Sequence, residues 1–237
     1  MLEKLEANSD EPIAKRVFRA LRNAIVTMQF RPGRALSEQE IARQLGVSRQ
    51  PVREAFIKLS EAGLLTVRPQ RGTFVVKISV KQVFDVRFVR EAVELAVLRK
   101  ACEMLPAEVI EALHGNLAEQ RAADAAHDHA RFLELDEAFH RTIALGSGCE
   151  CAWRVVEEAK AQMDRVRYLS LPNATPIERL IEQHQAVVDG IVARDPDRAE
   201  SAMRVHLREI LTSLPELERR FPELFDSDGA PSSSAAA

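Results

Sequence analysis

Residues 36–75 are the segment that most constrains this chain, because they hold signals for two short helices and a following pair of strands. Ser37 and Glu40 form an S-x-x-E capping box, which is typical of a helix start. Gly46 supplies the left-handed backbone that commonly ends a helix, and Ser48 begins a second one with a proline in its first turn. Two helices joined by a glycine turn indicate a helix-turn-helix, whose second helix enters the major groove of DNA.

The second helix and the strands after it have the chemistry of a DNA-binding surface. Arg49 and Arg53 are four residues apart and share one helix face, with Gln50 beside them. Arginine can bond two acceptors on guanine, and glutamine can do the same on adenine. A polar helix face is often simply solvated, but residues 65–77 predict a two-stranded wing with Arg71 near its tip. The combination favours DNA binding.

These residues also carry a family resemblance. The segment PGRALSEQEIARQLGVSRQPVREAFIKLSEAGLL, followed by RGTFV, resembles the N-terminal winged-helix domain of the GntR family of bacterial transcription regulators. The resemblance extends from about Pro12 to Ile78, and V-S-R-x-P-V-R-E-A is its most specific part. It implies contacts to operator DNA from Arg34, Arg49, Gln50, Arg53 and Gly72. Gln39 departs from the pattern, since some members have arginine there, and no DNA contact is assigned to it.

Composition separates a basic head from an acidic body. Residues 1–78 contain 14 Lys and Arg against 8 Asp and Glu, whereas the remainder contains 19 against 28. This split suits a DNA-binding module attached to a domain that does not contact DNA. No apolar run reaches the ~18–20 residues of a membrane span, and the charged N-terminus is unlike a signal peptide, so we expect a cytoplasmic protein.

The three cysteines are expected to be reduced thiols. An odd number argues against a disulfide framework, and the C-x-C of Cys149 and Cys151 has no second thiol pair with which to bind a metal. The low-complexity residues 226–237 are expected to be disordered.

The body of the chain shows helical periodicity and no further strand signals. Short breaks at proline or glycine separate six amphipathic segments: 80–104, 106–122, 129–145, 151–169, 176–193 and 196–214. The predicted fold is therefore mainly α. A winged helix-turn-helix with a small two-stranded wing occupies residues 10–78, and an all-α helical bundle occupies residues 79–216.

Four residues of this bundle have the pattern of a metal site. Asp136 and His140 are four residues apart on one helix, so both project from the same face. His184 and His206 lie 11 residues before and after Asp195, so an antiparallel helix pair would place them at one level. A single helical histidine is usually structural, but four matched residues favour Zn²⁺, Ni²⁺ or Mn²⁺ with positions left open for a ligand.

A second resemblance covers the same residues. The motifs D-E-A-F-H at 136–140, E-Q-H at 182–184 and M-R-V-H-L at 203–207 resemble the metal-binding pattern of the FCD effector domain in the FadR subfamily of GntR regulators. The D-x-x-x-x-R-x-x-x-E pattern at 85–94 resembles the opening of that domain. The resemblance implies a homodimer whose metal-floored pocket takes a small carboxylate.

The remaining pocket chemistry is predicted from arginines. An inward Arg90 would bind a carboxylate in bidentate fashion, although a surface salt bridge with Glu94 is the alternative. Arg165, Arg167 and Tyr168 on the fourth segment of the bundle are further candidates for effector binding. These donors predict an organic or sugar acid as the effector.

We therefore expect a homodimeric, metabolite-responsive regulator that binds double-stranded operator DNA and represses a catabolic operon. It is not expected to be an enzyme. The alternative is a metal-dependent hydrolase or lyase fused to a DNA-binding head, because three histidines and an aspartate can also activate water. A third possibility is an architectural DNA-binding protein with a structural metal.

Overall fold

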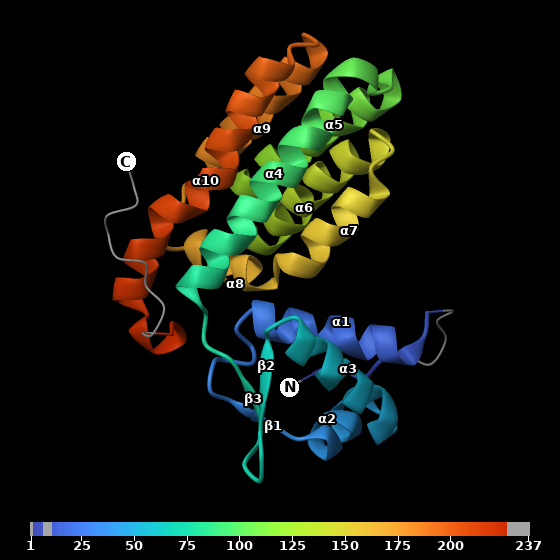
Figure 1. The fold of residues 1–237 in the computed structure, drawn as a ribbon, viewed down its shortest axis with the longest axis vertical. Coiled ribbons are helices and arrows are strands. Elements are labelled where there is room, and N and C mark those ends of the chain that lie inside the picture. Colours follow the sequence, from blue (N-terminus) through green and yellow to red (C-terminus); the bar gives the residue numbers. More distant parts are fainter. Residues whose placement is uncertain (1, 7–10, 227–237) are drawn as a thin grey trace. The chain divides into compact units, whose positions relative to one another are not determined.

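A computed structural model of the 237-residue chain describes residues 2–6 and 11–226. The chain divides into two compact units (Figure 1). The first contains residues 1–81, residues 161–165 and the stretch that begins at Phe221, and the second contains residues 82–160 and 166–220. Residues 227–237, for which the sequence predicts disorder, lie outside the described residues.

The first unit contains the predicted helix-turn-helix. Its helices are α1 (Ile13–Val26), α2 (Glu38–Leu45) and α3 (Arg49–Glu61). The Oγ atom of Ser37 accepts a hydrogen bond from the Glu40 amide, and Gly46 ends α2 with a φ of 71°. One apolar cluster joins the three helices, with Val17, Leu21, Ile41, Leu45, Val52 and Leu59 buried in it.

The predicted wing is present, and a short third strand joins its sheet. Strands β1 (Ala35–Leu36), β2 (Leu65–Arg68) and β3 (Gly72–Val75) form an antiparallel sheet in the order β1-β3-β2. The predicted two-stranded wing is the hairpin of β2 and β3. The sequence did not indicate β1, because a strand of two residues is too short to show an alternating pattern. Gly72, with a φ of 105°, begins β3 in a conformation that favours glycine.

The second unit is the predicted all-α bundle. Its helices are α4 (Val80–Met104, which begins in the first unit), α5 (Ala107–Ala125), α6 (His129–Gly146), α7 (Glu150–Ala159), α8 (Ala161–Ser170, shared with the first unit), α9 (Ile177–Val192) and α10 (Pro196–Arg220). The segment 151–169, predicted as one helix, is two. It breaks at Lys160, whose ψ of 0° departs from helical geometry and whose buried Nζ lies 2.8 Å from Oε2 of Glu137.

Segments that are distant in the sequence belong to the first unit. The amide of Ile78 donates to the carbonyl of Leu224 in the short 3-10 helix Pro222–Leu224, which places this later segment in the first unit. Gln162 donates to the carbonyl of Gly63 over 2.7 Å, and Arg165 donates to the carbonyl of Val76 over 2.9 Å. Local composition does not reveal such long-range hydrogen bonds.

The core of the second unit is built from Leu, Val, Ala and a few aromatic side chains. Leu98, Leu113, Phe139, Val187, Met203 and Leu207 are among its buried members.

Within residues 2–6 and 11–226, no helix combines the length and the apolar composition needed to cross a lipid bilayer.

Helices α9 and α10 approach each other closely at a glycine, and this contact generates a prediction. A Cβ atom added at Gly190 would lie 2.7 Å from the Cα atom of Ala199, whereas one added at Gly115 of α5 would meet nothing within 4 Å. We expect Gly190→Ala to destabilise the fold by about 1–3 kcal/mol through overpacking. The control Gly115→Ala should stabilise it by about 0.5–1 kcal/mol, as alanine does in a helix. Urea unfolding measures both, and a Gly190→Ala protein as stable as wild type would contradict the packing described.

Candidate functional site

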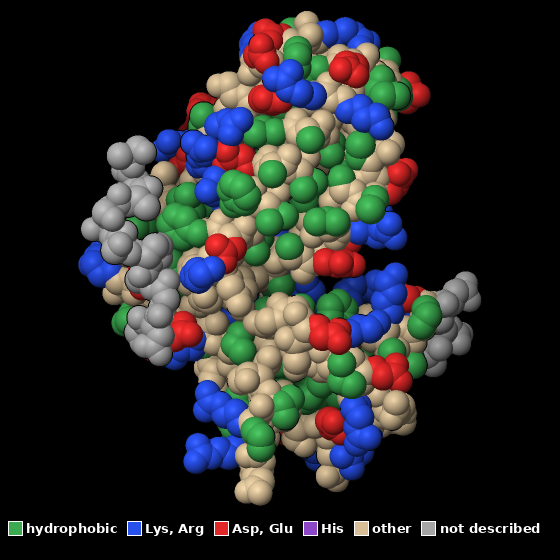
Figure 2. All heavy atoms as spheres, in the orientation of Figure 1, with side chains coloured by type: hydrophobic (Ala, Val, Ile, Leu, Met, Phe, Trp, Pro, Cys, Tyr) green, Lys and Arg blue, Asp and Glu red, His purple; other side chains and the backbone are tan. Residues whose placement is uncertain are grey.

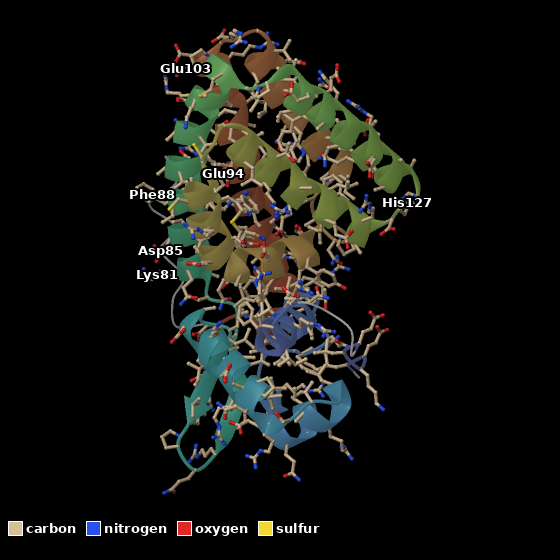
Figure 3. All side chains as sticks on the ribbon, turned by 90° about the vertical axis from the view of Figure 1, so that its right-hand side faces the viewer. Lys81, Asp85, Phe88, Glu94, Glu103 and His127 are labelled. Atoms are coloured by element: carbon tan, nitrogen blue, oxygen red, sulfur yellow. The ribbon has the colours of Figure 1, made fainter. Side chains whose placement is uncertain are left out.

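Three helices bring the four predicted metal residues together. Asp136 and His140 project from α6, His184 from α9 and His206 from α10. All four are buried, and one potential ligand atom from each lies within 4.8 Å of the others. His127 lies in the turn between α5 and α6, away from Glu94, whose carboxylate borders the cluster (Figure 3).

The imidazole rings are arranged around a common point. Nε2 of His206 lies 3.1 Å from Nε2 of His140 and 3.3 Å from Nε2 of His184. Oδ1 of Asp136 lies 3.6 Å from Nε2 of His184. The Phe139 ring stacks on His184 with the ring centroids 4.3 Å apart and fixes one wall of the cluster.

The opposite ring nitrogens face acceptors outside the cluster. Nδ1 of His184 lies 2.9 Å from Oε1 of Gln120, and Nδ1 of His206 lies 3.3 Å from Oε1 of Gln183. The two amide groups are oriented by their nitrogens, which donate to Asn116 and Glu209 respectively. Because an amide oxygen only accepts, Nδ1 of each ring carries the proton and Nε2 presents its lone pair to the common point.

The third histidine has a charged neighbour. Oε2 of Glu94 lies 2.6 Å from Nδ1 of His140, and Nε of Arg90 donates to the other oxygen of Glu94 over 2.6 Å. Burial acts to raise the pKa of Glu94, but the charges of Arg90 and His140 outweigh it and bring the pKa to about 2. Arg90 therefore forms a buried pair with Glu94, and the surface salt bridge considered from the sequence is not found.

Electrostatics keeps two of the histidines neutral and the aspartate ionised. Burial lowers the pKa of His184 to about 3 and that of His206 well below its usual value. For Asp136, burial acts to raise the pKa, but Arg167 and then the histidines outweigh it and hold the pKa well below its usual range. Neutral imidazoles and a carboxylate are the protonation states that a divalent metal requires.

The candidate effector residues separate into two groups. Nη2 of Arg167 forms an ion pair with Oδ2 of Asp136 and so reaches the cluster. Arg165 is fully buried in the first unit, where it bonds the Val76 carbonyl and the Gln162 side chain. It therefore does not lie with Arg167, and Tyr168 is a half-buried residue of the same helix.

The space beside the cluster is small. Glu94 and His140 line a hollow of about 10 Å³, together with Val93, Val97, Trp153, Met203 and four other apolar residues. That volume holds about one water molecule. A small acid could enter here only if side chains move.

The donor set fits a metal ion. Among the described residues, Oδ1 of Asp136 has no hydrogen-bond partner although it is buried. An unpartnered buried carboxylate oxygen is costly, and a cation would remove that cost. Three imidazole nitrogens and one carboxylate oxygen are ligands that Zn²⁺, Ni²⁺ and Mn²⁺ accept.

The second predicted surface lies on α3 and the wing. Arg49 and Arg53 are more than half exposed, and Glu38 binds both: its Oε2 lies 3.1 Å from Arg49 and 3.3 Å from Arg53. Hydrogen bonds from Arg53, aided by those from Arg49, lower the pKa of Glu38. The sequence reading missed Glu38, although its place in the first turn of α2 is a usable signal.

The other DNA-binding candidates surround the same region. Arg49, Arg53 and Gly72 line a shallow hollow of about 460 Å³. Arg34 lies over the Phe30 ring at 4.4 Å, and Arg71 is exposed at the wing turn. Gln50 donates to Glu54 over 3.1 Å on the exposed face of α3. Lys and Arg side chains are prominent around α2, α3 and the β2–β3 turn (Figure 2).

A winged helix-turn-helix with an exposed basic recognition helix, joined to a helical bundle, defines a DNA-binding transcription regulator. The family descriptions agree: the model for bacterial regulatory proteins of the gntR family matches residues 13–75, and the FCD domain model matches residues 85–209. The chain belongs to the GntR family of transcription regulators and carries an FCD domain.

Individual relatives support the same assignment. The chain is 40% identical over 228 residues to the HTH-type transcriptional repressor RspR of Escherichia coli (strain K12), which covers 96% of this chain and 100% of that protein. It is 38% identical over 218 residues, 90% of each protein, to an HTH-type transcriptional regulator of Streptomyces ambofaciens. The structure of E. coli McbR/YncC has the same fold, with a TM-score of 0.75 and 20% identity over 89% of this chain and 99% of that one. The comparisons give no support to the hydrolase or lyase alternative.

Proposed function

We propose that this regulator is a metabolite-responsive repressor of a catabolic operon, controlled by a small organic or sugar acid at a metal centre. The observation that carries the proposal is the clustering of three Nε2 atoms beside the buried carboxylate of Asp136, one oxygen of which lacks a hydrogen bond. RspR is named a repressor, and a relative from Paenarthrobacter nicotinovorans, 29% identical over 183 residues, is named a probable D-xylose utilization operon transcriptional repressor. Because both relatives are named repressors, we favour repression of the operon for this chain as well.

Asp136, His140, His184 and His206 would hold one Zn²⁺, Ni²⁺ or Mn²⁺ ion. The bound metal would supply open coordination positions for an anionic oxygen of the effector. Gln120, Gln183 and Glu94 orient the three imidazoles.

Arg167 is the guanidinium best placed to meet an effector carboxylate. It is now paired with Asp136, whose charge it balances. A divalent cation would balance that charge instead and leave the guanidinium available for a bidentate bond to an acid. Arg90 stays with Glu94 and holds His140 in place, so we assign it a positioning role.

Helix α8 connects the proposed metal centre covalently to the DNA-binding unit, because its residues belong to both units. Its residues 161–165 belong to the first unit, where Asp164 binds Arg22 of α1 over 2.6 Å. Arg167 follows on the same helix and belongs to the second unit. An acid that changes the position of Arg167 would thus act on a helix whose first turn is bound to α1. Only an acid with different affinity for the two arrangements shifts them.

On DNA, we propose that Arg49, Gln50 and Arg53 read base edges in the major groove. Arg34 and Arg71 would bind phosphate, and Gly72 would let the wing approach the DNA backbone. Two chains would bind two half-sites as a homodimer.

The first test concerns the recognition helix. Arg49→Ala and Arg53→Ala should each weaken binding to a duplex selected with the wild-type protein by about 1–3 kcal/mol, the range for a lost bidentate base contact. Arg71→Ala should weaken binding to all duplexes and reduce the salt slope by about 1. The control Lys58→Ala alters an exposed residue farther along α3. Fluorescence anisotropy at several salt concentrations measures this, and unchanged affinity in the Arg49/Arg53 double variant would refute the assignment.

The second test concerns the metal. Wild-type protein loaded with Zn²⁺, Ni²⁺ or Mn²⁺ should retain about one ion per chain after dialysis, because four side chains bind it. His140→Ala should lose the ion, and Gln120→Leu should bind it about 10–100-fold more weakly because a ring loses its orienting partner. His114→Ala, which removes an exposed histidine of α5, is the matched control. Metal analysis with chelator competition decides the matter, and a wild-type stoichiometry near zero would contradict the site.

The third test concerns control by acids. One hydroxy- or sugar acid of a panel should change wild-type operator affinity at least tenfold, which requires about 1.4 kcal/mol of differential binding. With the metal bound, Arg167→Gln should remain folded because the cation balances Asp136, and His184→Ala should remain folded because Arg167 still pairs with Asp136. Both variants should bind DNA but lose most of the response to the acid. Arg121→Gln, at an exposed arginine of α5, should respond like wild type. An undiminished response in His184→Ala would show that the metal centre is not the sensor.

A further inference from the structure

We propose that the exposed face of α4 binds a second copy of this chain, with the two α4 helices antiparallel and related by a two-fold axis at Ala92. This inference rests on the proposed function in one respect, the homodimer. It adds the helix face through which the two chains meet and the register of the two α4 helices. The face consists of residues spaced three or four apart along α4, all of them exposed: Lys81, Asp85, Phe88, Ala92, Ala96, Arg99 and Glu103. Such spacing places them on one side of a helix.

The centre of this face is apolar, although it is open to solvent. Phe88 is 66% exposed, and Ala92 and Ala96 follow it at intervals of four residues. The other side of α4 is buried within its own bundle, where Leu95, Leu98 and Ala101 join the core and Arg90 pairs with Glu94. A large exposed aromatic ring beside small side chains is typical of a surface that another protein covers. Hydrophobic side chains are spread over the part of the surface where Figure 1 draws α4 (Figure 2).

The face is complementary to itself in one register. Phe88 and Ala96 lie four residues before and after Ala92, so a two-fold axis there places the large ring of one copy against the small side chain of the other. Asp85 and Arg99 lie seven residues before and after Ala92, and Lys81 and Glu103 lie eleven. Each of these pairs therefore joins opposite charges. The labelled side chains Lys81, Asp85, Phe88 and Glu103 follow the same edge of the view in Figure 3.

The opposite orientation lacks this complementarity. Two parallel helices would place Asp85 against Asp85 and Arg99 against Arg99, and like charges directly opposite each other are unfavourable. Small residues at the centre also let two helices approach to about 8 Å, the short end of the usual range. Arg99 already binds Asp197 and Glu200 of its own chain, but a guanidinium has five N–H donors and can bind a further carboxylate. An isologous contact of this kind closes a dimer.

The location of the interface is tested by a charge at the axis. Ala92→Glu places two carboxylates against each other at the two-fold axis, so we expect it to convert a dimeric protein into monomers at micromolar concentration. The control Ala118→Glu makes the same change at an exposed alanine of α5 and should remain dimeric. Sedimentation velocity measures the mass, and circular dichroism verifies that both variants are folded. A monomeric wild type, or a folded Ala92→Glu protein that stays dimeric, would overturn the proposal.

The register is tested by disulfide cross-linking in a Cys149→Ser, Cys151→Ser background. Ala92→Cys should cross-link to itself across the axis on mild oxidation. Phe88→Cys alone should not, whereas a mixture of Phe88→Cys and Ala96→Cys chains should form a mixed dimer. Cross-linking of Phe88→Cys with itself would indicate parallel helices and overturn the antiparallel register.

Operator binding separates this inference from the function on which it rests. If Ala92→Glu stays dimeric and binds the selected duplex like wild type, the face is wrong and the regulator assignment stands. If Ala92→Glu dissociates the dimer while wild type binds no duplex at all, the interface stands and the proposed function fails. The expected result is a monomer that binds a two-half-site duplex at least tenfold more weakly than the Ala118→Glu control.

Discussion

Three imidazoles and a carboxylate occupy the interior of a bundle whose core is mainly apolar, and the polar groups around them make this burial tolerable. Removing such groups from water is unfavourable unless hydrogen bonds or charges compensate the loss. Gln120, Gln183 and Glu94 supply partners for the three Nδ1 atoms, and Arg167 supplies the charge for Asp136. Oδ1 of Asp136 is buried without a hydrogen bond and lies 3.6 Å from Nε2 of His184. A cation at this position would compensate the burial of that oxygen.

The spacing of these residues allowed the cluster to be predicted, whereas their partners were not. The i, i+4 relation of Asp136 and His140 is a property of one helix. The equal distances of His184 and His206 from Asp195 require only that the chain reverse there. Gln120 comes from α5, and its contact with His184 depends on the relative rotation of two helices, which no local pattern encodes. Glu38 was missed for a similar reason, since its bonds to the recognition arginines join two helices across a turn.

Helix phase explains why one candidate arginine reaches the cluster of Asp136 and the three histidines and the other does not. Residues two apart in an α-helix point about 200° apart, so Arg165 and Arg167 cannot serve the same site while α8 stays helical. Arg167 bonds Asp136, and Arg165 bonds the Val76 carbonyl in the first unit. The different directions of Arg165 and Arg167 follow from their spacing in the sequence. The broken helix at Lys160 and the attachment of residues 161–165 to the first unit do not follow from it, because both depend on contacts with distant residues.

The arginines of the proposed DNA-binding surface and of the histidine cluster differ in how easily they change partners. This difference determines whether metal or acid has to bind first in the proposed mechanism. Glu38 binds Arg49 and Arg53 at the surface, where each guanidinium is more than half exposed and such pairs contribute little, so DNA phosphates and bases can replace the carboxylate cheaply. Arg167 instead balances Asp136, whose side chain is only 1% exposed. Withdrawing the arginine alone would leave a buried, unpaired carboxylate, which is strongly unfavourable. A carboxylate effector can therefore recruit Arg167 only after a cation has taken over Asp136, so the proposed response to acid depends on prior loading of the metal.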